Sequence, residues 1–172
     1  MAKQAGFTLI EIIAVLLIIA VVATVSGMAI VTGVRGYIFA TDNASISQKA
    51  QMAITRINRE LMELVDVTSA EQSRITYRKL DDTTATIYFS DPEDTINIVS
   101  GENTSGGDML VDRVGLFQLT YSQGLDQSDP PWIVGTDVSK LSTIGIELRL
   151  ERFEGELSVM FATRISPRNN KE

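Results

Sequence analysis

The apolar residues of this chain are concentrated near its start. An unbroken apolar run extends from Ile12 to Ala23, and hydrophobic character continues with small polar interruptions to about Val34. A helix that spans a bilayer needs about 20 predominantly apolar residues, so this stretch is long enough to cross a membrane. Because apolar residues occupy every helical face as far as Val31, the pattern predicts a helix surrounded by lipid.

From Tyr37 the pattern becomes amphipathic. Apolar residues recur at intervals of three and four, the spacing of one helical face, at Ile46, Ala50, Ala53, Ile57, Leu61 and Leu64. The opposite face carries Gln48, Lys49, Gln51, Arg59 and Glu63. We therefore predict one long helix from Phe7 to about Val65, with residues 41–43 as the place where an irregularity would fall. Its second half should lie on a sheet, and its arginines and glutamates after residue 55 should form a solvated face with weak ion pairs.

Short alternating runs after the helix predict β-strands. Residues 74–80 and 84–90 flank a short turn and form a predicted hairpin. The residues expected to face each other are Ile75 and Tyr77 on one strand and Ile87 and Phe89 on the other. Further strands are expected at residues 95–99, 109–114 and 116–122, the last with Phe117, Leu119 and Tyr121 in alternation.

The clearest hairpin comes last. Its first strand alternates apolar and polar positions, with Ile144, Ile146, Leu148 and Leu150 on the apolar face. Gly155 supplies a turn, and the return strand carries Leu157, Val159 and Phe161. The polar residues 100–108 and the longer stretch 123–142 are expected to be loops, and residues 164–172 a polar tail.

Glu11 is the one charged residue inside the apolar stretch. A carboxylate at that depth costs on the order of 2.5–3.5 kcal/mol to insert, so an intramembrane charge indicates a function. A secretory signal peptide cut near Ala23 would have an overlong apolar region interrupted by this charge. An ordinary signal anchor would leave Glu11 unexplained.

The hexapeptide from Gly6 to Glu11, Gly-Phe-Thr-Leu-Ile-Glu, closely resembles the class III signal of type IV pilins and type II secretion pseudopilins. The short leader with its single Lys3 is similar to the leaders of that family. The resemblance implies that a prepilin peptidase cuts between Gly6 and Phe7 and that the new Phe7 amine is methylated. It also implies that Glu11 helps to register the subunit in a helical filament.

The same resemblance implies an α+β, pilin-like fold, in which a long N-terminal helix packs on an antiparallel sheet. The expected divisions are a leader at 1–6, a membrane and filament-core helix at 7–35, its amphipathic continuation at 36–66 and a β-rich domain at 67–172. The implied location is the bacterial inner membrane, as a single-pass protein with a periplasmic domain, and then the pilus or pseudopilus. The implied partners are other pilins or pseudopilins, the prepilin peptidase and methyltransferase, and an inner-membrane assembly platform.

The C-terminal part has a looser similarity to J-type minor pseudopilins and the related PilW-type minor pilins. It rests on the Met-Leu-Val-Asp-Arg-Val segment at 109–114 and on the ending Arg-Ile-Ser-Pro-Arg-Asn at 164–169. This similarity favours a minor subunit near the filament tip. The sequence leaves open a type II secretion pseudopilus, a type IV pilus or a DNA-uptake system. A tip-located adhesin or ligand-binding minor pilin is the alternative; in that case Trp132 would recognise a ligand instead of covering the sheet.

Composition narrows the chemistry. The 172 residues include 22 acidic and 15 basic side chains, for a formal charge of −7, so nucleic acid is not an expected partner. The chain has no cysteine and cannot form the disulfide of many major type IV pilins, which favours pseudopilins and minor pilins. It has no histidine, the commonest general base. We therefore expect a structural protein with no enzymatic activity and no cofactor.

Aspartates in the second long loop are the weak candidates for a metal site. They are Asp126, Asp129 and Asp137. Calcium prefers several oxygen ligands, and some pseudopilins bind it in a C-terminal loop. Their spacing does not match a known calcium loop, so a solvated acidic loop is the favoured interpretation and no metal is expected.

Overall fold

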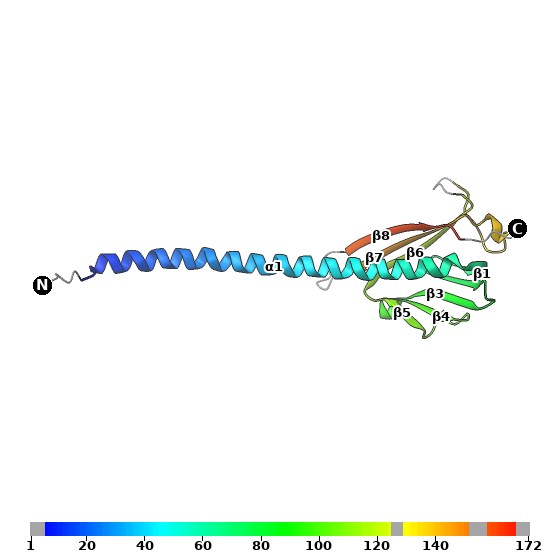
Figure 1. The fold of residues 1–172 in the computed structure, drawn as a ribbon, viewed down its shortest axis with the longest axis horizontal. Helices are drawn as coiled ribbons and strands as arrows, with labels where there is room; N and C mark the ends of the chain where they lie inside the picture. The colour runs from blue at the N-terminus through cyan, green and yellow to red at the C-terminus, as the bar shows by residue number, and fades with distance from the viewer. Residues whose placement is uncertain (1–5, 125–128, 152–157, 168–172) are drawn as a thin grey trace. The chain divides into compact units, whose positions relative to one another are not determined.

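The computed structural model describes residues 6–124, 129–151 and 158–167 (Figure 1). The chain forms two compact units that meet between Asp42 and Asn43. The first unit is helical, and the second holds the end of the same helix and eight strands. The predicted α+β class, with a long apolar N-terminal helix and antiparallel sheets, is confirmed.

Helix α1 runs from Leu9 to Met62 without a break. The expected irregularity near residues 41–43 is absent, and the Thr41 hydroxyl donates to the Tyr37 carbonyl at 2.9 Å. The helix ends before Val65 because the backbone there pairs with a strand instead of continuing the helix. The Glu63 carbonyl accepts a hydrogen bond from the Leu80 amide at 3.1 Å. The next strand, β1 (Leu64–Ala70), was not predicted from the sequence.

The first sheet is an antiparallel meander in the order β1-β2-β3-β4-β5. Its further strands are β2 (Arg74–Lys79), β3 (Thr84–Ser90), β4 (Thr95–Ser100) and β5 (Asp108–Val111). The predicted hairpin is β2–β3, with Ile75 opposite Ile87 as expected. Tyr77, however, lies opposite Ala85, and Phe89 pairs with Ile96 of β4. The tight turn, closed by the Lys79 amide on the Thr83 carbonyl at 2.9 Å, sets this register.

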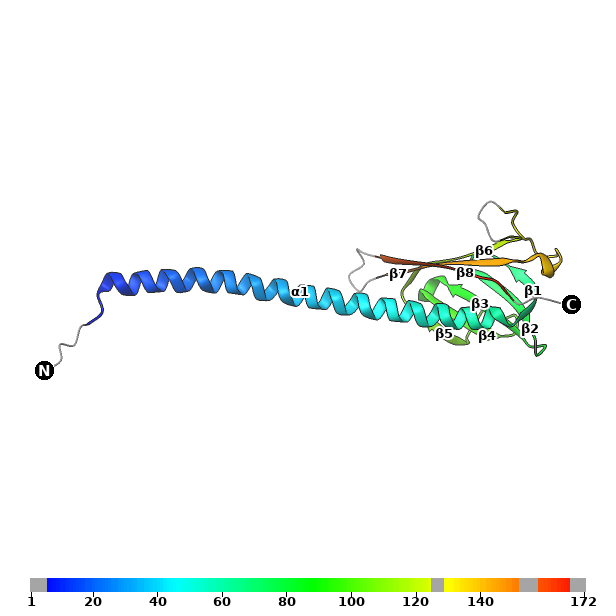
Figure 2. The ribbon, with the colours of Figure 1, turned by 45° about the horizontal axis from the view of Figure 1, so that its top comes forward.

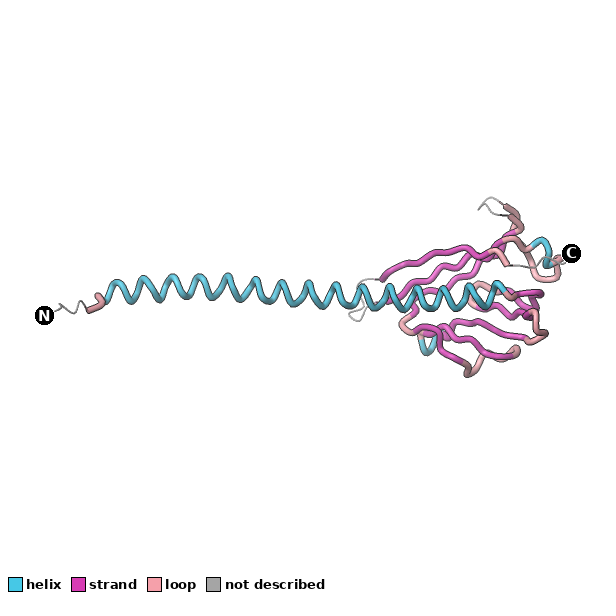
Figure 3. Tube along the Cα trace, in the orientation of Figure 1, coloured by secondary structure: helices cyan, strands magenta, loops and turns pink. Residues whose placement is uncertain are grey.

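The second sheet has the order β6-β7-β8 and is also antiparallel (Figure 3). Its strands are β6 (Val114–Ser122), β7 (Thr143–Glu151) and β8 (Ser158–Ile165). The expected strands at 109–114 and 116–122 put a break at residue 115, but the break between β5 and β6 falls at Asp112 and Arg113, so Val114 begins β6. Arg113 adopts a left-handed φ of 57° there. All four predicted apolar positions of β7 are buried. Gly155 and Leu157 lie outside the described residues.

One hydrophobic core joins the end of α1 to both sheets. The predicted stripe of Ile46, Ala50, Ala53, Ile57, Leu61 and Leu64 is buried, although Leu64 belongs to β1. The last turns of α1 run alongside the two sheets in both ribbon views (Figures 1 and 2). Two short 3-10 helices, η1 (Asp91–Glu93) and η2 (Val138–Lys140), lie in the connections.

Candidate processing and assembly site

The N-terminal end of α1 is capped by residues of its own first turn. Residues 6–8 are non-helical, and Thr8 is the N-cap because its carbonyl accepts from the Glu11 and Ile12 amides at 3.1 and 3.2 Å. The Glu11 carboxylate reaches back to the Thr8 amide, with Oε2 at 3.4 Å from the nitrogen. This is the carboxylate half of a capping box. The Thr-x-x-Glu spacing before an apolar run is the sequence signal for this cap, which was not among the predictions.

Gly6 and Phe7 are accessible. Gly6 is exposed, and a Cβ added to it would meet no atom within 4 Å, so the fold itself places no demand on glycine here. The Phe7 side chain is 82% exposed. Cleavage between these residues stays a prediction, but the segment is open to an enzyme, and a substitution at Gly6 would disturb no packing in the described chain.

The apolar part of α1 buries none of its side chains within its own unit. Within the described chain, α1 is the one helix long and apolar enough to cross a membrane. None of the residues in its most apolar stretch is buried. Its polar interruptions are satisfied internally, since the hydroxyls of Thr24 and Thr32 donate to the carbonyls of Ala20 and Met28. Hydroxyls bonded to their own helix suit a hydrocarbon environment, where unsatisfied polar groups are costly. The helix is consistent with a membrane anchor.

The prediction of a solvated face on α1 is wrong in one respect, because the Glu60 side chain is buried against β2. Its carboxylate forms an ion pair with the Lys79 ammonium and accepts from the Tyr77 hydroxyl at 3.4 Å. Arg56 is more distant, with Nε 3.9 Å from Oε1. Burial, and then the Glu60 charge, raise the pKa of Tyr77 well above its usual value, so the phenol stays protonated and donates. Helical periodicity did not reveal this group, since its partners come from a strand.

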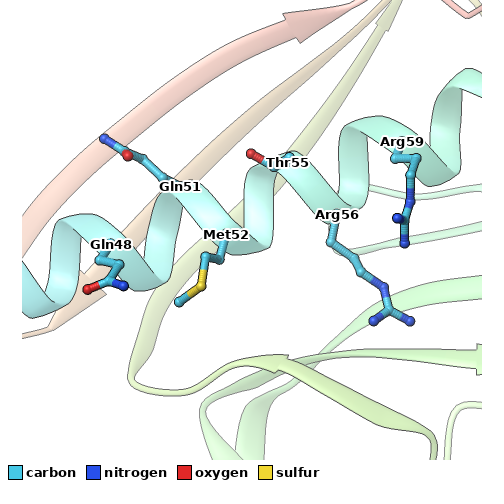
Figure 4. Close-up of a pocket in the computed structure, with 6 residues that line it drawn as sticks. All are labelled: Gln48, Gln51, Met52, Thr55, Arg56 and Arg59. Atoms are coloured by element: carbon cyan, nitrogen blue, oxygen red, sulfur yellow. The ribbon is translucent and has the colours of Figure 1, made fainter.

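A hollow of about 400 Å³ lies along this helical segment, and Arg56 is part of its lining (Figure 4). It is lined by Gln48, Gln51, Met52, Thr55, Arg56 and Arg59. These residues all belong to α1 and include no carboxylate or hydroxyl held near a base. The hollow is thus an open strip of helix surface, and its lining provides no nucleophile with an adjacent base.

Trp132 covers the second sheet, as predicted. Its side chain is 4% exposed and joins the hydrophobic core. The indole Nε1 donates to the Asp137 carbonyl at 3.1 Å, and its ring lies 6.5 Å from the Tyr121 ring. The backbone amide donates to the Tyr121 carbonyl at 3.0 Å. A ring held this way serves packing rather than ligand recognition.

The acidic residues do not assemble into a metal site within the described chain. No group of three or more metal-ligating side chains occurs there. Asp137 caps η2 by accepting from the Ser139 amide at 3.0 Å, and Asp129 lies beside Gly124. Asp126 is outside the described residues. The weak calcium candidates therefore gain no support from the described residues.

Asp112 directly follows β5, within the segment 109–114 that resembles J-type pseudopilins, and it contacts α1. Its carboxylate accepts two hydrogen bonds from the Lys49 ammonium, at 2.7 and 3.0 Å. This hydrogen bonding lowers the pKa of Asp112 below its usual range, despite an opposing effect of burial. The pair fastens the end of β5 to the helix, so a structural role accounts for it.

Comparison with known proteins gave one match, to the model of the prokaryotic N-terminal methylation motif, over residues 1–27. No curated protein and no solved structure matches the chain. The matched segment contains Gly6, Phe7, the Glu11 cap and the first turns of α1. The match supports the interpretation of this chain as a protein of the type IV pilin and pseudopilin kind. It ends before the globular unit, so it offers nothing on the J-type similarity.

Proposed function

We propose that this chain is a structural subunit of a pilus or pseudopilus, anchored in the inner membrane until it is assembled. The observation that carries the proposal is the methylation motif at residues 1–27, which coincides with the capped head of an apolar, uncovered helix. A filament-core helix needs exposed apolar faces, because lipid covers them before assembly and neighbouring helices cover them afterwards. The second unit, with its own core, is the part that would lie outside the cytoplasm.

We propose that residues 1–6 are a leader removed by a prepilin peptidase and that Phe7 is then methylated. Residues 7–35 would span the membrane, and the helix beyond them would carry the β-rich domain. The test is mass spectrometry of the membrane-purified protein expressed in a pilus-forming bacterium. A methylated Phe7 terminus is the expected result. A terminus after Ala23, or an intact leader, would contradict the proposal.

Glu11 would serve assembly through its charge. An ionised carboxylate without a partner is strongly disfavoured in hydrocarbon. In a filament, the Phe7 amine of a neighbouring subunit would provide that partner, and opposite charges attract strongly where the dielectric constant is low. Glu11 would therefore favour addition of subunits in one axial register.

Two substitutions separate this charge from the cap seen in the structure. Glu11→Val removes both, whereas Glu11→Gln keeps an oxygen that can accept from the Thr8 amide. We expect both variants to be processed after Gly6 and to co-purify about tenfold less partner pilin, as expected for the loss of an ion pair worth roughly 1.4 kcal/mol. If the Gln variant assembles like the wild type, the cap and not the charge is what matters.

The remaining details are proposals of the same kind. The partners would be other pilins or pseudopilins and the inner-membrane assembly platform, and the role would be mechanical rather than catalytic. We place the chain among minor, J-type subunits near the tip, on the loose motif around Asp112. Co-purification of the full chain with each candidate partner would test this placement, and recovery along the whole filament instead of at its end would contradict it.

A further inference from the structure

One face of the amphipathic part of α1 is uncovered in the second unit. It borders the hollow described above, and its side chains are exposed. We call this face the helical strip, formed by Gln48, Gln51, Met52, Thr55, Arg56 and Arg59. The strip includes no carboxylate, and its two arginine side chains extend from the same side of the helix (Figure 4). The strip is therefore polar and positively charged.

The arginines of the strip are only weakly neutralised by their own chain. The Arg56 guanidinium lies 3.7 Å from the Asp108 carboxylate and 3.9 Å from that of Glu60, which is beyond ordinary hydrogen-bond length. Among the residues that the structure describes, no side-chain ion pair or hydrogen bond involves Arg59. The chain as a whole is acidic, with a formal charge of −7. A positive surface on an acidic chain favours a partner that presents carboxylates.

The complementary charge lies on the turn between β3 and β4. Helix η1 and the residue after it carry exposed carboxylates, which we call the acidic turn: Asp91, Glu93 and Asp94. Within the described part of the chain, none of these carboxylates forms an ion pair. The backbone of the turn is fixed, because Pro92 restricts φ and the Asp94 carbonyl accepts from the Val114 amide at 2.8 Å. The acidic turn therefore presents unpaired negative charge on a rigid support.

The helical strip and the acidic turn lie at different levels along α1. Val114, which holds the acidic turn, closely follows Asp112, and Asp112 is hydrogen-bonded to Lys49. Arg56 and Arg59 lie two to three turns beyond Lys49 on the helix, on the order of 10–15 Å at about 5.4 Å per turn. A second copy displaced by that distance along the helix would bring its acidic turn level with these arginines.

We propose that the helical strip is the surface at which the acidic turn of a second copy of this chain docks, with the two copies parallel and the second shifted away from the membrane. The inference rests on the proposed function, because copies anchored in one membrane have parallel α1 helices. The two surfaces differ, so the contact is heterologous, and repeating it with an axial shift extends a filament instead of closing a ring. Opposite charges fix the register of the contact. Two adjacent copies are enough to form it, which agrees with a minor subunit.

Cross-linking between single cysteines tests the contact in the full chain, which has no cysteine of its own. Differently tagged Met52→Cys and Ser90→Cys chains are co-expressed in a pilus-forming bacterium, and their membranes are treated with a short bismaleimide. Ser90 precedes the acidic turn and its side chain makes no capping hydrogen bond, so the turn keeps all its carboxylates. The matched control uses Met160→Cys on β8 in place of Met52→Cys, because both methionines are 57% exposed.

We expect the pair of Met52→Cys and Ser90→Cys to give a mixed cross-link well above the control. Equal yields from the two pairs, or cross-links to a different protein only, would overturn the proposal. Mass spectrometry of the N-terminus in the same samples separates the contact from the proposed function. Processed Phe7 termini with equal cross-link yields would overturn the contact alone. A specific cross-link between chains that keep their leader would support the contact and contradict the proposed processing.

Exchange of the charges provides the second measurement and guards against misfolding. One variant makes the strip acidic, by Gln51→Glu with Arg59→Glu, and the other makes the turn basic, by Asp91→Lys with Glu93→Lys. In each variant alone like charges meet, so recovery of a differently tagged copy of the same variant should fall about tenfold. When the two variants are co-expressed, each strip meets a turn of opposite charge and recovery should return, which an unfolded chain could not achieve. Failure of the mixture to recover would refute the contact.

Discussion

Helix α1 contains two segments that place apolar residues in different environments. Before Asp42, large side chains such as Leu16 and Ile18 are 61% and 62% exposed. After it, Ile46, Ile57 and Leu61 are at most 1% exposed. The backbone is helical in both segments, so the difference lies in what surrounds each one. Apolar residues on every face indicate a lipid or helix environment, and a single stripe indicates a packed domain.

The contrast predicts that substitutions in the two segments change different measurable properties of the protein. Substitutions before Asp42 should change processing and assembly while leaving the stability of the second unit unchanged. Substitutions after it should change the free energy of unfolding. Trp132 is the chain's single tryptophan and is buried in the second unit, so its fluorescence reports unfolding of that unit alone.

The largest expected effect is on processing. Gly6→Leu should leave essentially all of the chain as precursor, because the small residue allows the backbone to lie extended in a protease site. The fold should be unaffected, since a side chain at Gly6 meets no atom within 4 Å. Intact-mass measurement of the membrane protein checks this, with Gly27→Leu as a control that should be cut normally. Normal cleavage of the Gly6 variant would argue against a prepilin peptidase.

The next effect is at the buried ion pair. Lys79→Met leaves the Glu60 carboxylate without its main partner, and breaking such a pair costs about 3–5 kcal/mol. Denaturant unfolding of the full chain in detergent micelles, followed by Trp132 fluorescence, measures the loss. Lys140→Met on exposed η2 is the control and should change stability by less than about 0.5 kcal/mol. Equal effects of the two variants would show that Glu60 is not held as the structure has it.

A pair of matched truncations tests the contrast directly. Ile57→Ala, in the buried stripe, should lower the unfolding free energy of the second unit by about 2–5 kcal/mol. Ile19→Ala, on an isoleucine that is 57% exposed in the first unit, should leave it within about 0.5 kcal/mol. The same unfolding assay serves both variants. A large loss from the Ile19 variant would mean that the stability of the second unit depends on the apolar segment.

The smallest effect concerns Lys49 and Asp112. Their side chains are 37% and 39% exposed, so Lys49→Met should cost at most about 0.5 kcal/mol at pH 7. The pKa of Asp112 is lowered in the folded state, so its contribution is present above the ordinary carboxyl pKa of about 3.9 and is lost as the pH falls below it. Stability compared from pH 7 to pH 2 should show the two proteins converging. A difference that stays at its full pH 7 size down to pH 2 would have to come from packing of the Lys49 side chain.

Much of the fold follows from periodicity, and the exceptions have physical causes. The stripe from Ile46 to Leu61 and the alternation in β7 were predicted correctly because one face of each element is buried. Strand β1 was missed because its run from Leu64 follows the helix directly, and the stripe continues into it. Pairing with β2 ended the helix, and local sequence does not contain that information.

The candidate site was predictable to a similar degree. Gly6, Phe7 and Glu11 were singled out because their motif is local and contiguous, and they lie within the matched residues 1–27, but their roles stay predictions. The buried Glu60 was not, since its partners Tyr77 and Lys79 lie on a strand brought to the helix only by folding. The cap between Thr8 and Glu11 is predictable from the Thr-x-x-Glu spacing alone, because both residues belong to the same helical turn.

The cap also has an electrostatic consequence for the mature protein. The atoms that close the helix belong to Thr8, Glu11 and Ile12, all of which lie after the proposed cut, so the helix start would survive removal of the leader. Cleavage would, however, create a positive amine at Phe7, next to the positive end of the helix macrodipole. A cation there is unfavourable by about 0.3–1 kcal/mol in exposed helices. The carboxylate of Glu11, fixed in the first turn, offsets both positive charges. One residue would thus compensate locally for the charge that processing creates, before any neighbouring subunit is present.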